Sequence, residues 1–319
     1  MTNSVITRPE AGTQVTRVAI EKLPAARDNY AMTSTDKSST DKSSTDESAQ
    51  TSRTQGFLDL HIPGQPLIMP NPWDVGSAKI LHSLGFKALA TTSAGFAHAS
   101  GKPDATLAVS RAEAIEHARQ IVEATTLPVN GDLERGFGDA PEDAATTITQ
   151  AGAAGLAGAS IEDSTSRPED PIFDRSFAIE RVAAAVEAAR AVPGGFVLTA
   201  RAEGFLWGHR DLDEVIARLT AFEAAGADVV YAPALPSLDA VAQVVSSVGV
   251  PVNVLAKPEW TVAEIGDTGA ARISLGSKLS MAAYSSLFAA ANEILESGSF
   301  TFAEGQISFN RLNKIFGSE

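Results

Sequence analysis

The chain of 319 residues contains no cysteine, and this absence excludes disulfides, thiolate metal sites and cysteine nucleophiles. The five histidines show no spacing typical of a metal site. No Gly-x-Ser-x-Gly elbow, phosphate-binding loop or dinucleotide fingerprint is present either. A metal ion bound by this chain would therefore be held by oxygen ligands, which suits magnesium or manganese.

Positive charge is scarce as well, because 25 Lys and Arg stand against 39 Asp and Glu, which gives a net charge of −14. This balance disfavours nucleic acids and anionic membranes as partners. No apolar run reaches the roughly 18 residues of a membrane span, and the N-terminus lacks the layout of a secretory signal. We expect a cytoplasmic protein with no nucleic-acid or membrane partner.

The first part of the chain is too polar to build a core. Asp36-Lys37-Ser38-Ser39-Thr40 is repeated at residues 41–45, and such a run cannot bury enough apolar surface to offset its ordering entropy. We predict a disordered tail over residues 1–54 and one domain over residues 55–319. Met32 could be the true start, in which case residues 1–31 are not translated.

After a short leading helix over residues 56–61, apolar runs alternate with longer segments of helical period. Strands are predicted at residues 66–69, 88–92, from Pro128, 156–161, 196–200, 228–231, 251–254 and 272–275. Helices are predicted at residues 75–84, 111–124, 141–153, 177–191, 212–225, 238–247, from 261, and 278–295. Eight such units favour a closed (β/α)8 barrel over a doubly wound sheet. After the first strand stands Asn71-Pro72-Trp73-Asp74 rather than a glycine-rich dinucleotide loop.

Active sites of such barrels lie at the C-terminal ends of the strands, where this chain gathers polar residues. The third strand is predicted to end in Asp132 and Glu134, whose alternate positions place both carboxylates on one face. Such close like charges repel each other unless a cation lies between them. The other strand ends supply Thr92 to Phe96, Glu162, Asp163, Arg201, Glu203, Tyr231 and Asn253.

These residues have a joint chemical logic. The acids can hold a divalent cation, and Arg201 can grip a carboxylate of an anionic substrate. Small residues at Ser93-Ala94-Gly95 let backbone N–H groups approach that carboxylate closely. Structural alternatives exist for several residues. Asp163 could be a cap and Asp74 a helix N-cap, Arg201 and Glu203 could form a structural ion pair, and Trp73 and Tyr231 could fill the barrel.

Six pieces of the chain, in order and each at an expected strand end, resemble the isocitrate lyase/phosphoenolpyruvate mutase superfamily. The resemblance covers residues 57–291. The pieces are Pro70 to Ala78, Thr92 to Gly95, Gly101 to Asp104, Asp132 to Gly138, Ile161 to Asp163, and Thr199 to Glu203.

The resemblance implies a magnesium-dependent enzyme, with manganese as the alternative, that acts on small 2-oxo or 2-hydroxy acids. Reaction would pass through an enolate-like state held on the metal, with a C–C or P–C bond broken or formed. It implies metal ligands Asp132, Glu134 and Glu162, with Asp104 nearby. The catalytic set would be Arg201, Asp104 and Glu203, and substrate contacts would come from Trp73, Ser93, Ala94, Gly95 and Asn253. It further implies a homotetramer whose C-terminal helices are exchanged between subunits.

The chain departs from the family pattern in informative ways. Glu134 stands where aspartate is usual, and Pro233-Ala234 replaces the usual Pro-Glu. The loop over residues 163–175 lacks both the cysteine of isocitrate and methylisocitrate lyases and the Asn/Lys-rich lid of the mutases. The general acid or base is therefore open, with Ser164, Thr165, Arg167 and Tyr231 as candidates.

Three functions remain in view at the level of sequence. The first is a magnesium-dependent carbon–carbon lyase or decarboxylase. The second is a phosphoenolpyruvate mutase-like or phosphonopyruvate-cleaving enzyme acting on a P–C bond. The third is a barrel that binds a metabolite without turnover.

Overall fold

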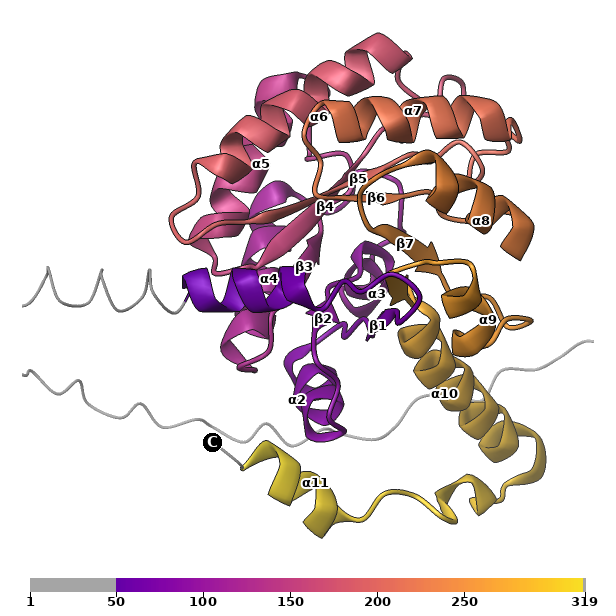
Figure 1. Ribbon diagram of the computed structural model, residues 1–319. Helices are drawn as coiled ribbons and strands as arrows, with labels where there is room; N and C mark the ends of the chain where they lie inside the picture. Colours follow the sequence, from indigo (N-terminus) through magenta and orange to yellow (C-terminus); the bar gives the residue numbers. More distant parts are fainter. Residues whose placement is uncertain (1–49, 318–319) are drawn as a thin grey trace, which may run out of the picture. The chain divides into compact units, whose positions relative to one another are not determined.

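The computed structural model describes residues 50–317, and the predicted tail up to residue 49 lies outside these described residues. Eight parallel strands form one sheet in the order β1-β8-β7-β6-β5-β4-β3-β2, which curls into a nearly closed barrel (Figure 1). The strands are β1 (Leu67–Met69), β2 (Leu89–Ala90), β3 (Val129–Asp132), β4 (Gly158–Glu162), β5 (Val197–Arg201), β6 (Val229–Tyr231), β7 (Val252–Leu255) and β8 (Arg272–Ser274). The predicted (β/α)8 fold is confirmed.

Helices follow the strands in sequence, and most of those between consecutive strands pack apolar side chains against the sheet. They are α2 (Val75–Ser83), α3 (Ser93–Ala99), α4 (Arg111–Glu123), α5 (Pro141–Ala153), α6 (Arg175–Arg190), α7 (Leu212–Ala224), α8 (Leu238–Ser247), α9 (Val262–Asp267), α10 (Lys278–Ser297) and α11 (Phe309–Phe316). Of these, α3 was not predicted, because its seven residues are too short and too small to show a clear period. No helix within residues 50–317 is long and apolar enough to cross a membrane.

A helix over residues 50–59 covers the N-terminal end of the barrel, so the leading helix begins at least six residues before the predicted Gly56. The assignment of residues 50–54 to a disordered tail is therefore corrected. Two side chains of this helix donate hydrogen bonds to carbonyls just before strands β4 and β5. Gln50 Nε2 donates to the Leu156 carbonyl at 2.9 Å, and Thr54 Oγ1 donates to the Gly195 carbonyl at 3.2 Å. The polar composition of this segment predicted that the entropy cost of ordering it would not be offset. These hydrogen bonds to buried turns help to offset that cost.

The barrel has a seam between β1 and β2, the two strands at the ends of the strand order. A backbone hydrogen bond of 3.0 Å from Ala90 N to the Pro70 carbonyl crosses this seam. The side chain of Asn71 reinforces it, because Nδ2 donates to the Thr91 carbonyl and Oδ1 accepts from Leu275 N, both at 2.9 Å. The buried Asn71 thus joins the ends of β1, β2 and β8.

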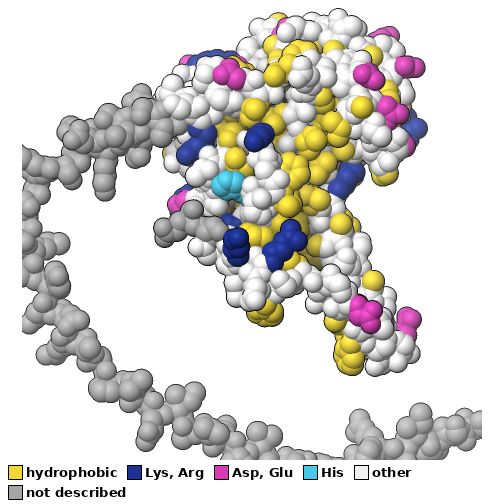
Figure 2. All heavy atoms as spheres, turned by 60° about the horizontal axis from the view of Figure 1, so that its bottom comes forward, with side chains coloured by type: hydrophobic (Ala, Val, Ile, Leu, Met, Phe, Trp, Pro, Cys, Tyr) yellow, Lys and Arg dark blue, Asp and Glu magenta, His cyan; other side chains and the backbone are white. Residues whose placement is uncertain are grey.

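The C-terminal part of the chain leaves the barrel. Helix α10 is 20 residues long, yet only Ser280 in it is buried. A short 3-10 turn, η1 (Thr301–Ala303), leads back to α11, which lies against α2, where Lys79 Nζ donates to the Phe316 carbonyl at 3.3 Å. Hydrophobic side chains gather on the face shown in Figure 2. On α10 and the segment after it, the exposed ones are Met281, Leu287, Phe288, Ile294, Leu295, Phe300, Phe302, Ile307, Phe309 and Phe316.

Candidate active site

Arg201, the last residue of β5, lies at the centre of an acidic cluster at the C-terminal ends of the strands. Its Nη1 is 2.7 Å from Asp132 Oδ1, and its Nη2 is 3.2 Å from Glu162 Oε2. Glu203 Oε1 lies 2.8 Å from both Nε and Nη2. One guanidinium thus binds acids from the ends of three neighbouring strands. The predicted Arg201–Glu203 pair exists, but it is only one part of this cluster.

Asp132 is held from the opposite side by the segment after β2. The backbone N–H and the hydroxyl of Ser93 both donate to Asp132 Oδ2 at 3.0 Å. Thr92 caps the new helix α3 by accepting from Gly95 N at 3.2 Å. The Ser93 and Gly95 N–H groups, which we expected to approach a substrate carboxylate, thus donate to Asp132 and Thr92 in this structure.

The backbone conformation that brings Glu134 to the cluster differs from the predicted extended strand. The strand β3 ends at Asp132, and Glu134 has φ of +49°, so the two acids do not alternate on one extended strand. This left-handed conformation is unusual for a residue other than glycine. The Glu134 carbonyl accepts a 3.0 Å hydrogen bond from Glu162 N, which places Glu134, in the loop after β3, beside the last residue of β4.

The carboxyl groups repel one another, and burial adds to the effect. Burial, with Asp132 and Asp104 nearby, raises the pKa of Glu134 to about 7. Burial and then Asp132 raise the pKa of Asp104. Glu162 is buried next to Glu203, and these two causes raise its pKa well above the ordinary value. Arg201 alone therefore does not keep all of these acids ionised near neutral pH.

Two adjoining cavities open on this cluster, with volumes of about 300 and 270 Å³. Both are lined by Ser93, Asp104, Arg201 and Leu206. Of the predicted site residues, the first cavity also has Ala94, Asp132 and Asn253, and the second has Glu134, Glu162 and Glu203. The structure thus brings nine of the predicted residues together.

Trp73 and Gly95 are the two predicted substrate-binding residues that line neither of these cavities. A Cβ on Gly95 would lie 3.1 Å from the Cβ of Trp73, so the two residues pack against each other. The Trp73 carbonyl instead lies 2.9 Å from His117 Nε2. Gly95 therefore permits close packing of α3 rather than access to a ligand.

Two acids with structural alternatives prove to be structural. Asp74 is the N-cap of α2 and accepts from Ser77 N at 2.6 Å. Asp163 is 3% exposed, accepts from Glu203 N at 2.7 Å and pairs with Arg218 at 3.1 Å. Asp163 therefore holds the backbone of Glu203 in place.

The four candidates for a general acid or base differ in whether they line one of the two cavities. Arg167 is paired with Asp139 at 2.7 Å, and Thr165 is fully buried, so neither lines the two cavities. Ser164 lines the second cavity and Tyr231 the first. The Tyr231 ring centroid lies 5.1 Å from Arg201 Cζ, and burial raises the pKa of its hydroxyl to about 12. Ser164 and Tyr231 remain the candidates with access to a ligand.

Sequence analysis missed two buried arginines. Arg181 on α6 is 1% exposed and donates to the carbonyls of Arg135, Gly138, Asp139 and Ala140, in the loop after β3. Arg272 on β8, also 1% exposed, lines the first cavity. A charged residue inside an otherwise apolar strand was the available signal for Arg272, whereas the sequence around Arg181 looks like an ordinary amphipathic helix.

The predicted ligands Asp132, Glu134 and Glu162 are not arranged as a ready-made metal site. Within residues 50–317, no three Asp, Glu or His side chains could hold a metal ion as they stand. The reason is that the Arg201 guanidinium lies among them. Their chemistry nevertheless fits a divalent cation, because the donors are all oxygen, and because burial together with neighbouring acids raises the pKa of Glu134 and of Glu162.

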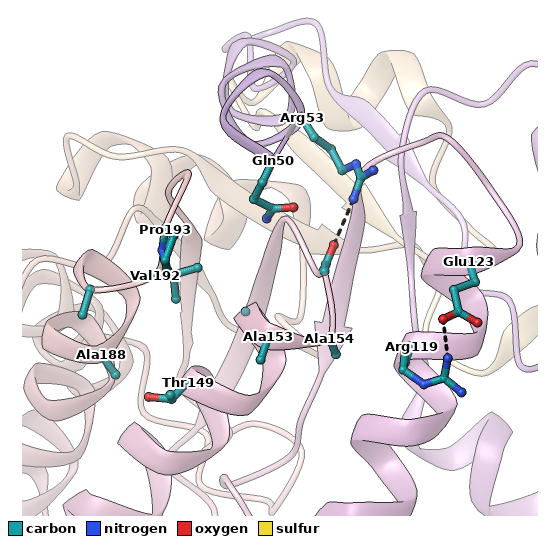
Figure 3. A pocket seen from close by; sticks show the side chains of 13 residues that line it. Gln50, Arg53, Arg119, Glu123, Thr149, Ala153, Ala154, Ala188, Val192 and Pro193 are labelled. Atoms are coloured by element: carbon teal, nitrogen blue, oxygen red, sulfur yellow. Dashed lines mark hydrogen bonds and ion pairs between the residues drawn. The ribbon is translucent and has the colours of Figure 1, made fainter. Parts of the chain in front are cut away.

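A third cavity, of about 770 Å³, is larger but lies at the other end of the barrel (Figure 3). It is lined by the helix over residues 50–59 and the C-terminal ends of α4, α5 and α6. Arg53 donates to the Gly155 carbonyl at 3.2 Å, and Arg119 is paired with Glu123. Its charged groups are thus engaged in structural contacts, and barrel enzymes place their chemistry at the opposite face.

The structure thus combines a (β/α)8 barrel with a buried cluster of ionisable groups at the C-terminal ends of its strands. The sequence profile described as phosphoenolpyruvate phosphomutase matches residues 57–295. The chain belongs to this family, and so to the isocitrate lyase/phosphoenolpyruvate mutase superfamily of enzymes, as the resemblance predicted.

Three similar proteins cover different parts of this range. The crystal structure of a provisionally assigned lyase/mutase from Burkholderia cenocepacia has 44% sequence identity and a TM-score of 0.82, covering 85% of this chain and 98% of that one. The 2-methylisocitrate lyase of Shewanella oneidensis is 34% identical over 182 residues, which is 55% of this chain and 60% of that protein. Oxaloacetate acetylhydrolase, solved with its product oxalate, has 25% identity and a TM-score of 0.75, covering 84% of this chain and 94% of that one.

Proposed function

We propose that this protein is a magnesium-dependent lyase that acts on a carbon–carbon bond of a small 2-oxo or 2-hydroxy carboxylic acid. The observation that carries the proposal is the buried acidic cluster in which the single guanidinium of Arg201 meets three carboxyl groups. The names of two similar proteins agree with it, since one is a 2-methylisocitrate lyase and the other was solved with the dicarboxylate oxalate.

In this proposal Asp132, Glu134 and Glu162 hold the cation, with Asp104 close to them. A divalent cation bound there would supply positive charge beside the substrate oxygens as negative charge develops on them. Manganese offers the same oxygen preference and is the alternative ion.

The chain's own groups then bind and orient the substrate. Arg201 is fixed by Glu203 through Nε and Nη2 at 2.8 Å, so its remaining N–H groups keep a constant direction. With a cation taking over Asp132 and Glu162, Nη1 of Arg201 is released to bind a substrate carboxylate. Asn253 and Ala94, which line the first cavity, bound the space where the rest of the substrate lies.

Phosphonate chemistry, with cleavage of a P–C bond, is the second candidate function. The family description itself favours it. Against it, Arg167 in the loop after β4 is paired with Asp139 and does not line the cavity. A phosphonate carries one more negative charge than a carboxylate and would need additional cations there.

We also propose that the protein is a homo-oligomer in which a second copy covers α10 and α11. Ten large hydrophobic side chains are exposed on this part of the chain, from Met281 to Phe316. Exposed apolar surface of this extent is typical of a protein–protein interface. A tetramer with exchanged C-terminal helices is the arrangement that the family resemblance implies.

The test is a ¹H and ³¹P NMR time course with Mg²⁺ and with EDTA. The panel holds oxaloacetate, 2-methylisocitrate, isocitrate, alkylmalates, phosphoenolpyruvate and phosphonopyruvate. A Mg²⁺-dependent pyruvate, glyoxylate or acetate signal is expected. A shifted phosphorus signal would favour the second function. Stabilisation by Mg²⁺ without any turnover would favour a barrel that only binds its ligand.

A further inference from the structure

A second cation lies beneath the acidic cluster, inside the barrel. Arg272 is 1% exposed and makes three hydrogen bonds. Its Nε donates to Asn253 Oδ1 at 2.8 Å, its Nη2 donates to Thr199 Oγ1 at 3.0 Å, and its Nη1 lies 3.3 Å from His61 Nε2. These contacts use three of the five N–H groups of the guanidinium.

None of these partners carries a negative charge. Among residues 50–317, no acidic side chain forms an ion pair with Arg272, whereas Arg201 has three acidic partners and Arg218 has two. A buried charge that is hydrogen-bonded but not compensated is costly, and burial, together with the nearby charge of Arg201, lowers the pKa of Arg272 to about 9. Such a group calls for an explanation beyond packing.

The side chain below Arg272 cannot supply the missing charge. An arginine only donates, so His61 Nε2 accepts, and its Nδ1–H donates to the Phe57 carbonyl at 2.9 Å. Both ring nitrogens of His61 are thereby assigned to its neutral form. Burial, followed by the charge of Arg272, lowers the pKa of His61 to about 4. His61 therefore leaves the charge of Arg272 uncompensated at neutral pH.

The space above Arg272 is the first cavity. Arg272 is paired in register with Asn253, two residues before the end of β8, and its Nη2 reaches Thr199, two residues before Arg201. The guanidinium therefore lies one layer deeper in the barrel than that of Arg201. Arg272 is thus the positively charged group at the floor of this cavity.

We propose that Arg272 forms a second anion subsite at the floor of the first cavity, where it binds a second anionic group of the substrate. This inference rests on the proposed function, which places the first carboxylate at Arg201. The second group, a carboxylate or a phosphonate, would point down the barrel axis toward Arg272. Its charge supplies the compensation that no protein side chain provides.

The experiment measures binding by calorimetry with saturating Mg²⁺ and three matched ligands. 2-Hydroxybutyrate has one anionic group, malate adds a carboxylate in place of the methyl group, and 2-hydroxy-3-phosphonopropanoate adds a phosphonate. The wild-type protein is expected to bind at least one of the two dianions about tenfold or more tightly than 2-hydroxybutyrate. Tighter binding of malate would indicate that the second anionic group is a carboxylate, and tighter binding of 2-hydroxy-3-phosphonopropanoate would indicate a phosphonate.

Two variants test whether Arg272 causes this preference. Arg272→Met should reduce it to threefold or less and leave the affinity for 2-hydroxybutyrate within threefold of wild type. Arg272→Lys, which keeps the charge, should retain more than threefold. Arg190→Met, on the outer surface, should behave as wild type. If the methionine variant does not fold, the proposal is tested by the preference for a dianion in the wild-type protein and in the lysine variant.

The failures can be told apart. If 2-hydroxybutyrate binds and the wild-type protein shows no preference for a dianion, the subsite is overturned and the proposed function stands. The same holds if the lysine and methionine variants weaken all three ligands equally, because Arg272 is then structural. If none of the three ligands binds, the proposed function falls and the subsite falls with it.

Discussion

The Arg201 guanidinium lies between the carboxylates of Asp132 and Glu162, with Nη1 2.7 Å from Asp132 Oδ1 and Nη2 3.2 Å from Glu162 Oε2. A single positive charge thereby occupies the position where two acids from neighbouring strands meet. A guanidinium and a divalent cation are alternative ways to neutralise this pair. The cluster therefore links substrate binding, metal binding and the stability of the metal-free protein.

Replacing Arg201 by alanine should affect metal and substrate in opposite directions. Without the guanidinium, the buried acids lose their cation, so the melting temperature in EDTA should fall by several degrees. The rise in melting temperature on adding Mg²⁺ should become larger than in wild type, because the acids then have no other partner. Substrate affinity should drop tenfold or more. A smaller Mg²⁺ effect than in wild type would show that Arg201 is needed to arrange the metal ligands.

Replacing Asp132 by alanine should abolish the Mg²⁺-dependent rise in melting temperature and lower kcat/KM by at least a hundredfold. Its carboxylate is the acid that contacts both Arg201 and Ser93. Circular dichroism should show the barrel intact. Glu116→Gln, which removes an exposed acid paired with Arg119, is the matched control and should leave both properties unchanged. Full activity of the Asp132 variant would remove it from the site.

As the pH rises, the melting temperature without metal should fall and the stabilisation by Mg²⁺ should grow. The pKa of Glu134 is raised to about 7 in the folded protein from about 4.5 in the unfolded chain, so the folded state holds a proton that the unfolded state releases. In EDTA, stability should therefore fall as the pH rises from about 4.5 to about 7. The stabilisation by Mg²⁺ should grow over the same range, because the metal needs ionised carboxylates.

Differential scanning fluorimetry between pH 5 and pH 8, in EDTA and in Mg²⁺, measures both trends. Glu134→Gln removes the titrating group and should flatten the curve in EDTA. An equally steep curve in this variant would assign the effect to other acids of the cluster.

Arg181 should be essential for the loop after β3. Its guanidinium satisfies four carbonyls of residues 135–140 and is 1% exposed, so Arg181→Met should cost about 3 kcal/mol of unfolding free energy. Arg190→Met removes an exposed arginine paired with Asp228 and should cost about 0.5 kcal/mol. Urea unfolding compares the two. Similar losses in both would contradict a special role for Arg181.

Disrupting the exposed apolar surface of α10 should dissociate the oligomer. Leu287 and Leu295 are 64% and 82% exposed, so replacing both by glutamate should not unfold the barrel of a single chain. Light scattering after size exclusion should then show a smaller species than wild type. Glu296→Lys, on the same helix, is the control. An unchanged mass would place the contacts between copies elsewhere.

The barrel could be predicted from the sequence because its strands are short apolar runs and its helices have regular periods. Asp132, Glu162 and Arg201 were found for the same reason, since strand order alone brings their C-terminal ends together. Positions that depend on local backbone conformation were predicted less well. Glu134 reaches the cluster through a left-handed φ rather than by strand alternation, and α3 begins within the segment expected to expose its N–H groups.

Contacts between distant segments were beyond the sequence. The helix over residues 50–59 is held by turns more than 100 residues away, through Gln50 and Arg53. The role of Arg181 depends on a loop some 40 residues earlier in the chain. In each case the residue type is compatible with an exposed helix surface, and only the packing of the barrel decides that it is engaged.

The seam closed by Asn71 has a consequence for the motions of the barrel. Elsewhere, neighbouring strands share a ladder of backbone hydrogen bonds, whereas β1 and β2 are joined by one such bond and one side-chain amide. Local opening begins where the fewest bonds must break, so the amide of Ala90 should be the barrel's earliest to exchange with deuterium. Asn71 thus sets the free energy at which the ring of strands opens, and it does so directly beside the segment that holds Asp132.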